Sequence, residues 1–270
     1  MALEGSAKFT GEVPEVWTDF QEYFDDETWL DTGILLGIDG ASEESDGARE
    51  ELVQKYPRDA LGASLVLGMF ETAIDAYEDG DTETALEYVE AAWVLYHGFE
   101  DGTGCATYGT GVSRARNFGF EPSDVIESVV AAFTSSIDAL SDDSDDTASV
   151  LESAYEDIKT GLIKTYLRAA IRYGNKMDGD AEADDGLNLR VNQLEGYAFF
   201  NAIAPFAGEA DADAAAMISA KFDPEMYAPA EDGSVDLSAY EDVRPAIEEA
   251  VSTIIAALGI SEEEFGILLS

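Results

Sequence analysis

Helical spacing of apolar residues runs through almost the whole chain, and this pattern leaves little room for β-structure. Within Thr82–His97, one apolar stripe repeats at intervals of three and four residues: Leu86, Val89, Trp93 and Tyr96. This spacing is typical of an amphipathic helix with one buried face. Alternating strand patterns are almost absent elsewhere. The sequence therefore predicts an all-α fold, a helical bundle in a single domain over residues 1–270.

Polar or glycine-rich connectors separate the predicted helices. Six glycines within Gly98–Gly119 predict a long loop there. Asp59 is placed as the N-cap of the helix that follows it. We expect helices at Pro14–Phe24, Glu27–Ile38, Gly47–Tyr56, Ala60–Ala76, Thr82–His97, Ser123–Leu140, Thr147–Met177, Gly186–Ala204, Asp211–Lys221, Tyr240–Leu258 and Glu262–Leu269.

A weak internal repeat relates residues 59–98 to residues 147–205. Each copy reads as a helical hairpin with an acidic turn, and Glu90 and Glu195 occupy matching positions on the second helices. Two such hairpins facing each other would form a pseudo-two-fold bundle with flanking helices. Binding sites in bundles are built from side chains on facing helices, so the space between the hairpins is the expected site.

The charge balance excludes several classes of function. The chain carries 58 acidic and 14 basic residues, a formal net charge of −44. A nucleic-acid-binding protein needs basic surface, and an anionic membrane surface would repel this chain. The 46% hydrophobic share predicts a folded protein rather than a disordered one. An acidic surface of this kind indicates a halophilic protein, because salt at about 1 M shortens the Debye length to about 3 Å.

Few features of the sequence indicate where in the cell the protein works or whether it contains disulfides. No apolar run is long enough to cross a membrane, so the sequence predicts no membrane insertion. Met1–Thr10 lacks the apolar region of a signal peptide. We expect either an extracytoplasmic protein whose leader is absent from this sequence, or a cytoplasmic protein of a high-salt cell. Cys105 is the single cysteine and is expected to be a small packed residue.

Three carboxylates stand out because they lie in apolar stretches rather than in solvated turns: Glu71, Glu90 and Glu195. A carboxylate inside an apolar helix must pair with a cation, take a proton or bind a metal. One interpretation is a metal site formed by these inward carboxylates. The other is a set of buried ion pairs with Arg168, Arg172 or Arg116. The two interpretations stay open at this point.

His97, the only histidine, lies seven residues after Glu90 and so on the same helix face. Tyr96 and Glu100 are its neighbours, and this donor set would suit iron(III). The Glu-x-x-His signature of di-iron bundles is absent, which disfavours a ferroxidase. The stretch Asp178–Leu189 fails as a calcium loop, since it lacks glycine at position six and glutamate at position twelve.

Two segments resemble a known family. Glu90–Gly119 reads EAAWVLYHGFEDGTGCATYGTGVSRARNFG, and Gln193–Pro205 reads QLEGYAFFNAIAP. Both are similar to the iron-assimilation, or low-iron-inducible periplasmic, proteins of green algae. In the first segment the matching positions are Glu90, Trp93, Tyr96, Gly98, Glu100, Asp101, Gly102, Tyr108, Arg116, Phe118 and Gly119. The chain departs from the family at His97 and in its acidic surface.

The resemblance implies a helical extracytoplasmic domain linked to iron uptake. The function expected first is a binding protein, not an enzyme, that holds iron(III) and presents it to a transporter. Arg168 or Arg172 would neutralise the acids or hold a synergistic anion such as carbonate. The alternative is a metal-free interaction domain of a cell-surface electron-transfer protein. We expect a monomer or a weak dimer.

Overall fold

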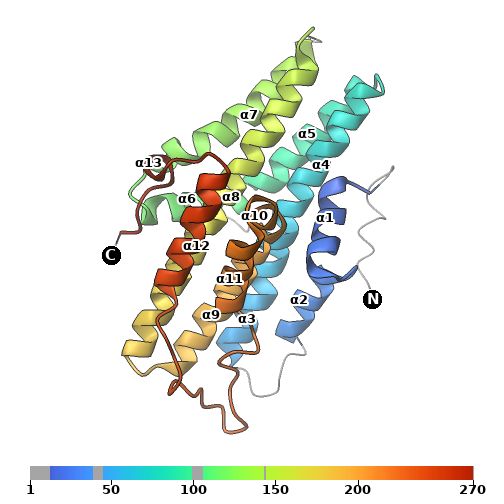
Figure 1. Cartoon of the computed structure of the whole chain (residues 1–270). Coiled ribbons are helices and arrows are strands. Elements are labelled where there is room, and N and C mark those ends of the chain that lie inside the picture. The colour runs from blue at the N-terminus through green and yellow to red at the C-terminus, as the bar shows by residue number, and fades with distance from the viewer. Residues whose placement is uncertain (1–12, 39–44, 99–105, 143, 270) are drawn as a thin grey trace.

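The computed structural model describes residues 13–38, 45–98, 106–142 and 144–269, and within these ranges every regular element is a helix. The predicted all-α fold is therefore confirmed (Figure 1). The elements are α1 (Glu15–Phe24), α2 (Trp29–Ile38), α3 (Asp46–Lys55), the π-helical turn η2 (Tyr56–Ala60), α4 (Leu61–Glu78), α5 (Thr82–His97), α6 (Thr107–Asn117), α7 (Pro122–Asp142), α8 (Thr147–Glu182), α9 (Gly186–Asn201), α10 (Ala204–Ala210), α11 (Ala212–Lys221), α12 (Arg244–Ala257) and α13 (Glu262–Phe265).

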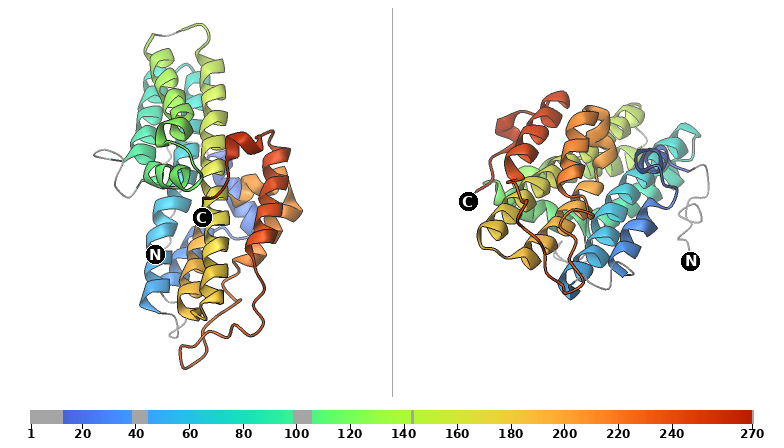
Figure 2. Two further views of the ribbon diagram at one scale, coloured as in Figure 1. Left: turned by 90° about the vertical axis from the view of Figure 1, so that its left-hand side faces the viewer. Right: turned by 60° about the horizontal axis from the view of Figure 1, so that its bottom comes forward.

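Helix α8, with 36 residues, is the axis of the molecule (Figure 2). Its first half packs against α7, where Gly161 allows a close approach because a Cβ at that position would overlap the side chain of Val129. Its second half packs against α9, where the ring centroids of Tyr173 and Phe199 lie 5.3 Å apart. The two halves of one helix therefore face different neighbours, and the candidate site lies along the second half.

Both predicted hairpins are present, as α4–α5 and α8–α9. Their turns are built alike. Asp81 caps α5 by accepting from the backbone N–H of Thr84, and Asp185 caps α9 by accepting from that of Asn188. The residue before each cap lies in the left-handed region, Gly80 in one turn and Asp184 in the other. A two-fold relation between whole hairpins stays a prediction.

The prediction of a loop over Gly98–Gly119 is wrong in its second half, where the chain forms α6. The buried positions of this helix are Thr107, Thr110, Gly111, Arg114 and Ala115. They follow the helical spacing of three and four residues, but none except Ala115 is an apolar residue with a side chain. The glycines and the polar buried face hid the periodicity from a search for apolar stripes.

Two further boundaries differ from prediction for visible reasons. Asp59 is not an N-cap; it lies in η2 with no exposed surface and accepts three side-chain contacts described below. Helix α12 begins at Arg244 rather than Tyr240. Asp178 on α8 accepts from the backbone N–H groups of Val243 and Arg244, which fixes the start of α12 there. Among the described residues, no helix is long and apolar enough to cross a membrane.

Candidate functional site: a cationic cluster in the bundle

Four of the chain's 14 basic residues lie on α8 at intervals of four: Lys164, Arg168, Arg172 and Lys176. Residues spaced by four lie on nearly the same face of a helix, so these cations form a row. The row divides between two neighbours. Lys164 and Arg168 bind α13, whereas Lys176 binds α9 and Arg172 lies beside it.

The nearest carboxylate to the second half of the row is Glu195 on α9, which is only 6% exposed. Tyr173 donates its hydroxyl to Glu195 Oε1 over 2.9 Å. Two ammonium groups flank the same carboxylate, Lys55 Nζ at 3.3 Å and Lys176 Nζ at 3.8 Å. Glu195 is therefore compensated by two cations and a phenol that come from two elements, α3 and α8.

Lys55, the last residue of α3, links Glu195 to a second acid. Its Nζ lies 3.0 Å from Glu51 Oε2, one turn earlier on α3. Burial raises the pKa of the Glu51 carboxyl, and the nearby Glu195 charge raises it further. Two carboxylates thus share one lysine, and this arrangement favours the protonated form of Glu51.

Asp59 is the deepest acid, because its side chain has no exposed surface. Arg58 Nη2 lies 2.6 Å from Asp59 Oδ2. Asp59 Oδ1 accepts hydrogen bonds from Thr110 over 2.8 Å and from Tyr166 over 3.1 Å. Burial alone would lower the pKa of Arg58, but the Asp59 carboxylate raises it overall. Arg58 and Asp59 therefore form a closed pair that joins η2 to α6 and α8.

One aromatic ring brings these groups together. The ring centroid of Phe199 on α9 lies 5.7 Å from Lys55 Nζ, 5.8 Å from Arg58 Cζ and 5.7 Å from Arg114 Cζ. Cations within about 6 Å of an aromatic face are attracted by its quadrupole. Five cations meet around Phe199 and Tyr173, and we call them the cationic cluster: Lys55, Arg58, Arg114, Arg172 and Lys176.

Two guanidinium groups of the cationic cluster, those of Arg114 and Arg172, form no ion pair with a carboxylate of the described residues. Arg114 is 8% exposed and donates one hydrogen bond, from Nη1 to Asn117 Oδ1 over 3.2 Å. Its Nε is buried and has no hydrogen-bond partner among the described residues, and the same is true of Arg172 Nε. Since a buried polar group without a partner is costly, these two atoms are the feature of the site that calls for an explanation.

The electrostatics of the two groups reinforce that point. Burial lowers the pKa of Arg114, and the positive charge of Arg172 acts in the same direction, against the charges of Glu195 and Asp59. Burial likewise lowers the pKa of Lys176; the charge of Glu195 opposes this shift, whereas Arg172 and Arg114 add to it. The cations of the cluster therefore repel one another, and an anion placed between them would relieve that repulsion.

Glu71, predicted as a ligand, lies elsewhere and is already engaged. Its Oε1 accepts from the hydroxyl of Tyr155 over 2.6 Å, and its Oε2 accepts from the backbone N–H of Val16 over 3.1 Å. Burial raises the pKa of the Glu71 carboxyl. Glu71 therefore holds the start of α1 against α4 and α8, rather than standing with Glu195.

The expectation that Glu90 points inward is wrong, because its side chain is exposed on α5. His97 stacks on Trp93 with a centroid distance of 4.6 Å and packs against Tyr108 at 4.7 Å. Tyr96 is buried nearby, and burial raises the pKa of its phenol. His97 and Tyr96 thus belong to an aromatic cluster, and Glu100 lies outside the described residues.

The arginines predicted as carboxylate partners bind differently. Arg168 donates from Nε to the Phe265 carbonyl over 2.9 Å and from Nη2 to the Glu264 carbonyl over 3.0 Å. Its guanidinium also lies within 6 Å of three phenylalanine rings, the nearest being Phe120 at 4.9 Å. Arg116 is exposed. Of the three, Arg172 alone acts electrostatically on Tyr173 and Lys176, the two α8 side chains that contact Glu195.

No group of three or more His, Cys, Asp or Glu side chains in the described ranges could hold a metal ion. Glu71, Glu90 and Glu195 are accordingly not brought together. The iron site expected from them is not assembled in this part of the chain.

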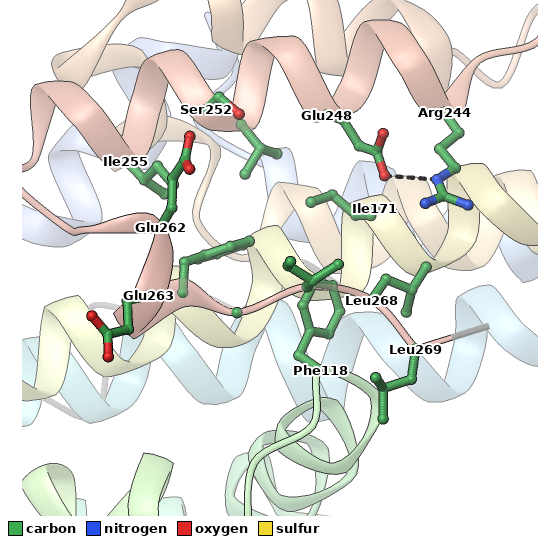
Figure 3. A pocket seen from close by; sticks show the side chains of 14 residues that line it. Phe118, Ile171, Arg244, Glu248, Ser252, Ile255, Glu262, Glu263, Leu268 and Leu269 are labelled. Atoms are coloured by element: carbon green, nitrogen blue, oxygen red, sulfur yellow. Dashed lines mark hydrogen bonds and ion pairs between the residues drawn. The ribbon is translucent and has the colours of Figure 1, made fainter.

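A groove of about 770 Å³ lies between α12 and the segment after α13 (Figure 3). Its floor is apolar, with Phe118, Ile171 and Leu268 among the lining residues. Arg244 Nε lies 2.7 Å from Glu248 Oε1 at its edge, and none of its lining residues has a buried side-chain polar atom without a partner among the described residues. The groove therefore lacks the unpaired polar atoms that distinguish the cationic cluster.

Sequence analysis missed most of the cluster: Lys55, Arg58, Arg114 and Lys176, with Glu51, Asp59 and Tyr173. It searched for rare carboxylates in apolar surroundings, whereas acids are abundant here and cations are scarce. With 14 basic residues against 58 acidic ones, each lysine or arginine inside an apolar helix was the more informative signal. Arg114 could have been found in this way, as Arg172 was.

No family model matches the chain, and neither a curated protein nor a solved structure matches it. The resemblance to algal iron-assimilation proteins therefore stays a prediction from two sequence segments.

Proposed function

We propose that the protein is a binding protein that holds a small anion between Arg114 and Arg172. The observation that carries this proposal is the pair of buried, unpartnered Nε atoms on these two neighbouring arginines. Guanidinium groups bind oxyanions through pairs of parallel N–H donors, so an anion would satisfy both atoms at once. An anion-binding role would also explain why five of the 14 basic residues gather inside the bundle.

The negative net charge of the chain makes the cationic cluster a stronger indication of an anion site. A net charge of −44 repels anions at long range. Surface residues therefore cannot collect anions here, and only a local excess of buried cations can bind one. Among the described groups, the cluster contains five cations against the four carboxylates Glu51, Asp59, Asp180 and Glu195.

The test is calorimetric titration of sulfate and phosphate into the folded protein in about 1 M NaCl, where surface repulsion is screened. We expect one saturable site that is weakened at least tenfold by Arg114→Gln. The matched control is Arg116→Gln, which removes the same charge two residues away on an exposed position of α6. Absence of saturable binding in the wild type, or equal effects of the two variants, would overturn the proposal.

Iron(III) binding and uptake outside the cytoplasmic membrane stay a prediction from the sequence. One observation links the two ideas, because Arg172 is, with Arg168, one of the two residues for which the sequence predicts a synergistic carbonate. Titrating iron(III) with and without carbonate in the same salt tests the link. Iron binding that requires carbonate and is lost in Arg172→Gln would support it, and iron binding unaffected by both would contradict it.

A further inference from the structure

A second pocket lies apart from the cationic cluster, at a place where three helices end. Its volume is about 470 Å³, a size that fits a small molecule. The C-terminal ends of α1, α9 and α11, with the turn after α11, supply its aromatic and polar residues: Tyr23, Phe24, Tyr197, Asn201, Ser219 and Asp223. None of its lining residues belongs to the cationic cluster, so a ligand bound here is independent of the anion proposed above.

Three aromatic rings line this pocket. Tyr23, Phe24 and Tyr197 are each only partly buried, so part of their surface is open to a ligand. The ring planes of Tyr23 and Phe24 are inclined by 84° with centroids 5.1 Å apart, so the two rings form a corner rather than a flat wall. The face of an aromatic ring attracts a cation through its quadrupole, and groups of such rings are typical of sites for methylated ammonium ligands.

Asp223 is the one charged side chain among the described residues that line the pocket. Its Oδ1 accepts from the backbone N–H of Glu225 over 2.8 Å, and no ion pair joins it to a basic residue in the described part of the chain. Lys221, the nearest basic residue along the sequence, does not line the pocket. The carboxylate of Asp223 is therefore available to balance a positive charge on a ligand.

The ends of the helices have the same electrostatic sign. Tyr23 and Phe24 are the last two residues of α1, and Asn201 is the last residue of α9. The C-terminal end of a helix carries a partial negative charge, and neither of these helices has a basic residue in its last turn. The net charge of −44 also attracts cations to the surface of this protein.

Aromatic pockets also bind sugars, but a sugar needs several hydrogen-bonding partners around its ring. Asn201 is only 3% exposed and already donates its amide to the hydroxyl of Tyr56. Besides the two tyrosines, Ser219 and Asp223 are the remaining polar side chains. A methylated ammonium group needs no hydrogen bonds, only aromatic surface and a negative charge. We infer that this pocket binds a small alkylammonium cation, with methyl groups against the rings and its charge balanced by Asp223.

The test compares two probes of the same shape: choline, and its neutral carbon analogue in which a tert-butyl group replaces the trimethylammonium group. Each is titrated into the full chain in about 1 M NaCl, which screens diffuse attraction to the acidic surface. Saturation-transfer NMR on the methyl singlet, which both probes show, follows binding. We expect choline to bind at a saturable site, about tenfold more tightly than its neutral analogue.

Variants connect the binding to the pocket. Asp223→Asn keeps the oxygen that accepts from Glu225 and removes the charge, and should weaken choline binding about fivefold. The matched control is Asp213→Asn, which removes the same charge from an exposed position in the first turn of α11 and should leave the affinity unchanged. Tyr197→Leu removes one ring and should weaken binding, whereas Tyr197→Phe keeps the ring and should retain it. Circular dichroism shows which variants are folded, and Asp223→Asn carries the test if Tyr197→Leu is not.

The outcomes distinguish the alternatives. Choline binding that exceeds that of the neutral analogue and falls selectively in Asp223→Asn would support the cation site. Equal binding of the two probes, or no saturable binding of choline, would overturn it. Equal losses in Asp223→Asn and Asp213→Asn would assign the binding to the acidic surface and overturn the pocket. Glucose is titrated in the same way, and tighter binding of glucose than of choline would show a sugar pocket instead.

Discussion

The two ends of the cation row on α8 have the same residue types and opposite circumstances. Arg168 is closed in by three phenylalanine rings and donates to two backbone carbonyls, while Lys164 pairs with Glu264 over 2.7 Å. Four residues on, Arg172 has a buried Nε with no partner among the described residues. Lys164 and Arg168 at the first end fasten α8 to α13. At the second end, Arg172 keeps a donor that a ligand could use.

The comparison teaches that burial of a cation does not by itself indicate a site. Arg168 is more buried than Arg172, and burial lowers its pKa to about 10. Its Nε and Nη2 donate to backbone carbonyls, although its Nη1 is also buried without a partner among the described residues. What distinguishes Arg172 is a second unpaired guanidinium beside it, that of Arg114. Two adjacent cations without acids indicate a ligand more strongly than one deeply buried cation does.

The largest difference between the two ends is expected when Arg168 and Arg172 are each replaced by methionine. Arg168→Met leaves the carbonyls of Glu264 and Phe265 without donors, which should lower the free energy of unfolding by about 4 kcal/mol. Arg172→Met removes an unpaired charge and should change it by less than about 1 kcal/mol. Urea unfolding in constant salt measures both. Similar losses in the two variants would show that the ends of the row do not differ.

A second test concerns the acid that compensates the available end. Glu195→Gln removes the charge that faces Lys55 and Lys176, and should lower the free energy of unfolding by about 3 kcal/mol. The control is Glu90→Gln, an exposed position where less than about 0.5 kcal/mol is expected. The same unfolding measurement applies. A negligible effect at Glu195 would mean that the cations around it are solvated rather than buried.

The smallest effect is expected at Glu51, as a dependence on pH. Burial and the charge of Glu195 raise the folded-state pKa of Glu51 above its unfolded value. The stability this contributes is present at low pH and is lost as pH rises through the folded-state pKa. Relative to Glu51→Gln, the wild type should therefore gain melting temperature as pH falls from about 7 to about 4.5. A constant difference between the two proteins over that range would contradict the shifted pKa.

The fold was largely predictable because its helices bury apolar stripes, as α5 does with Val89 and Tyr96. The exception, α6, buries threonine, glycine and arginine, and no apolar count detects such a face. The candidate site was less accessible to prediction. Glu195 could be identified from its apolar neighbours, but exposed Glu90 has similar neighbours in sequence. Which side of a helix faces the bundle depends on tertiary packing, and a lone acid in an apolar stretch does not encode it.

Partners were the hardest feature to predict. Lys55 and Lys176 reach Glu195 from α3 and α8, across sequence separations that no local pattern specifies. Arg168 seemed equivalent to Arg172 by spacing, yet the chain places carbonyls of α13 against it. Such assignments depend on the whole bundle having formed.

Helix α6 has a consequence for how long a ligand could stay bound. Its sequence, TYGTGVSRARN, is poor in strong helix formers, so its order depends on its docking against α7 and α8. Segments of this kind open locally far more often than a whole domain unfolds. Each opening of α6 would carry Arg114 away from Phe199 while Arg172 stays on α8. The residence time of an anion held between the two arginines would therefore be limited by the lifetime of one docked helix.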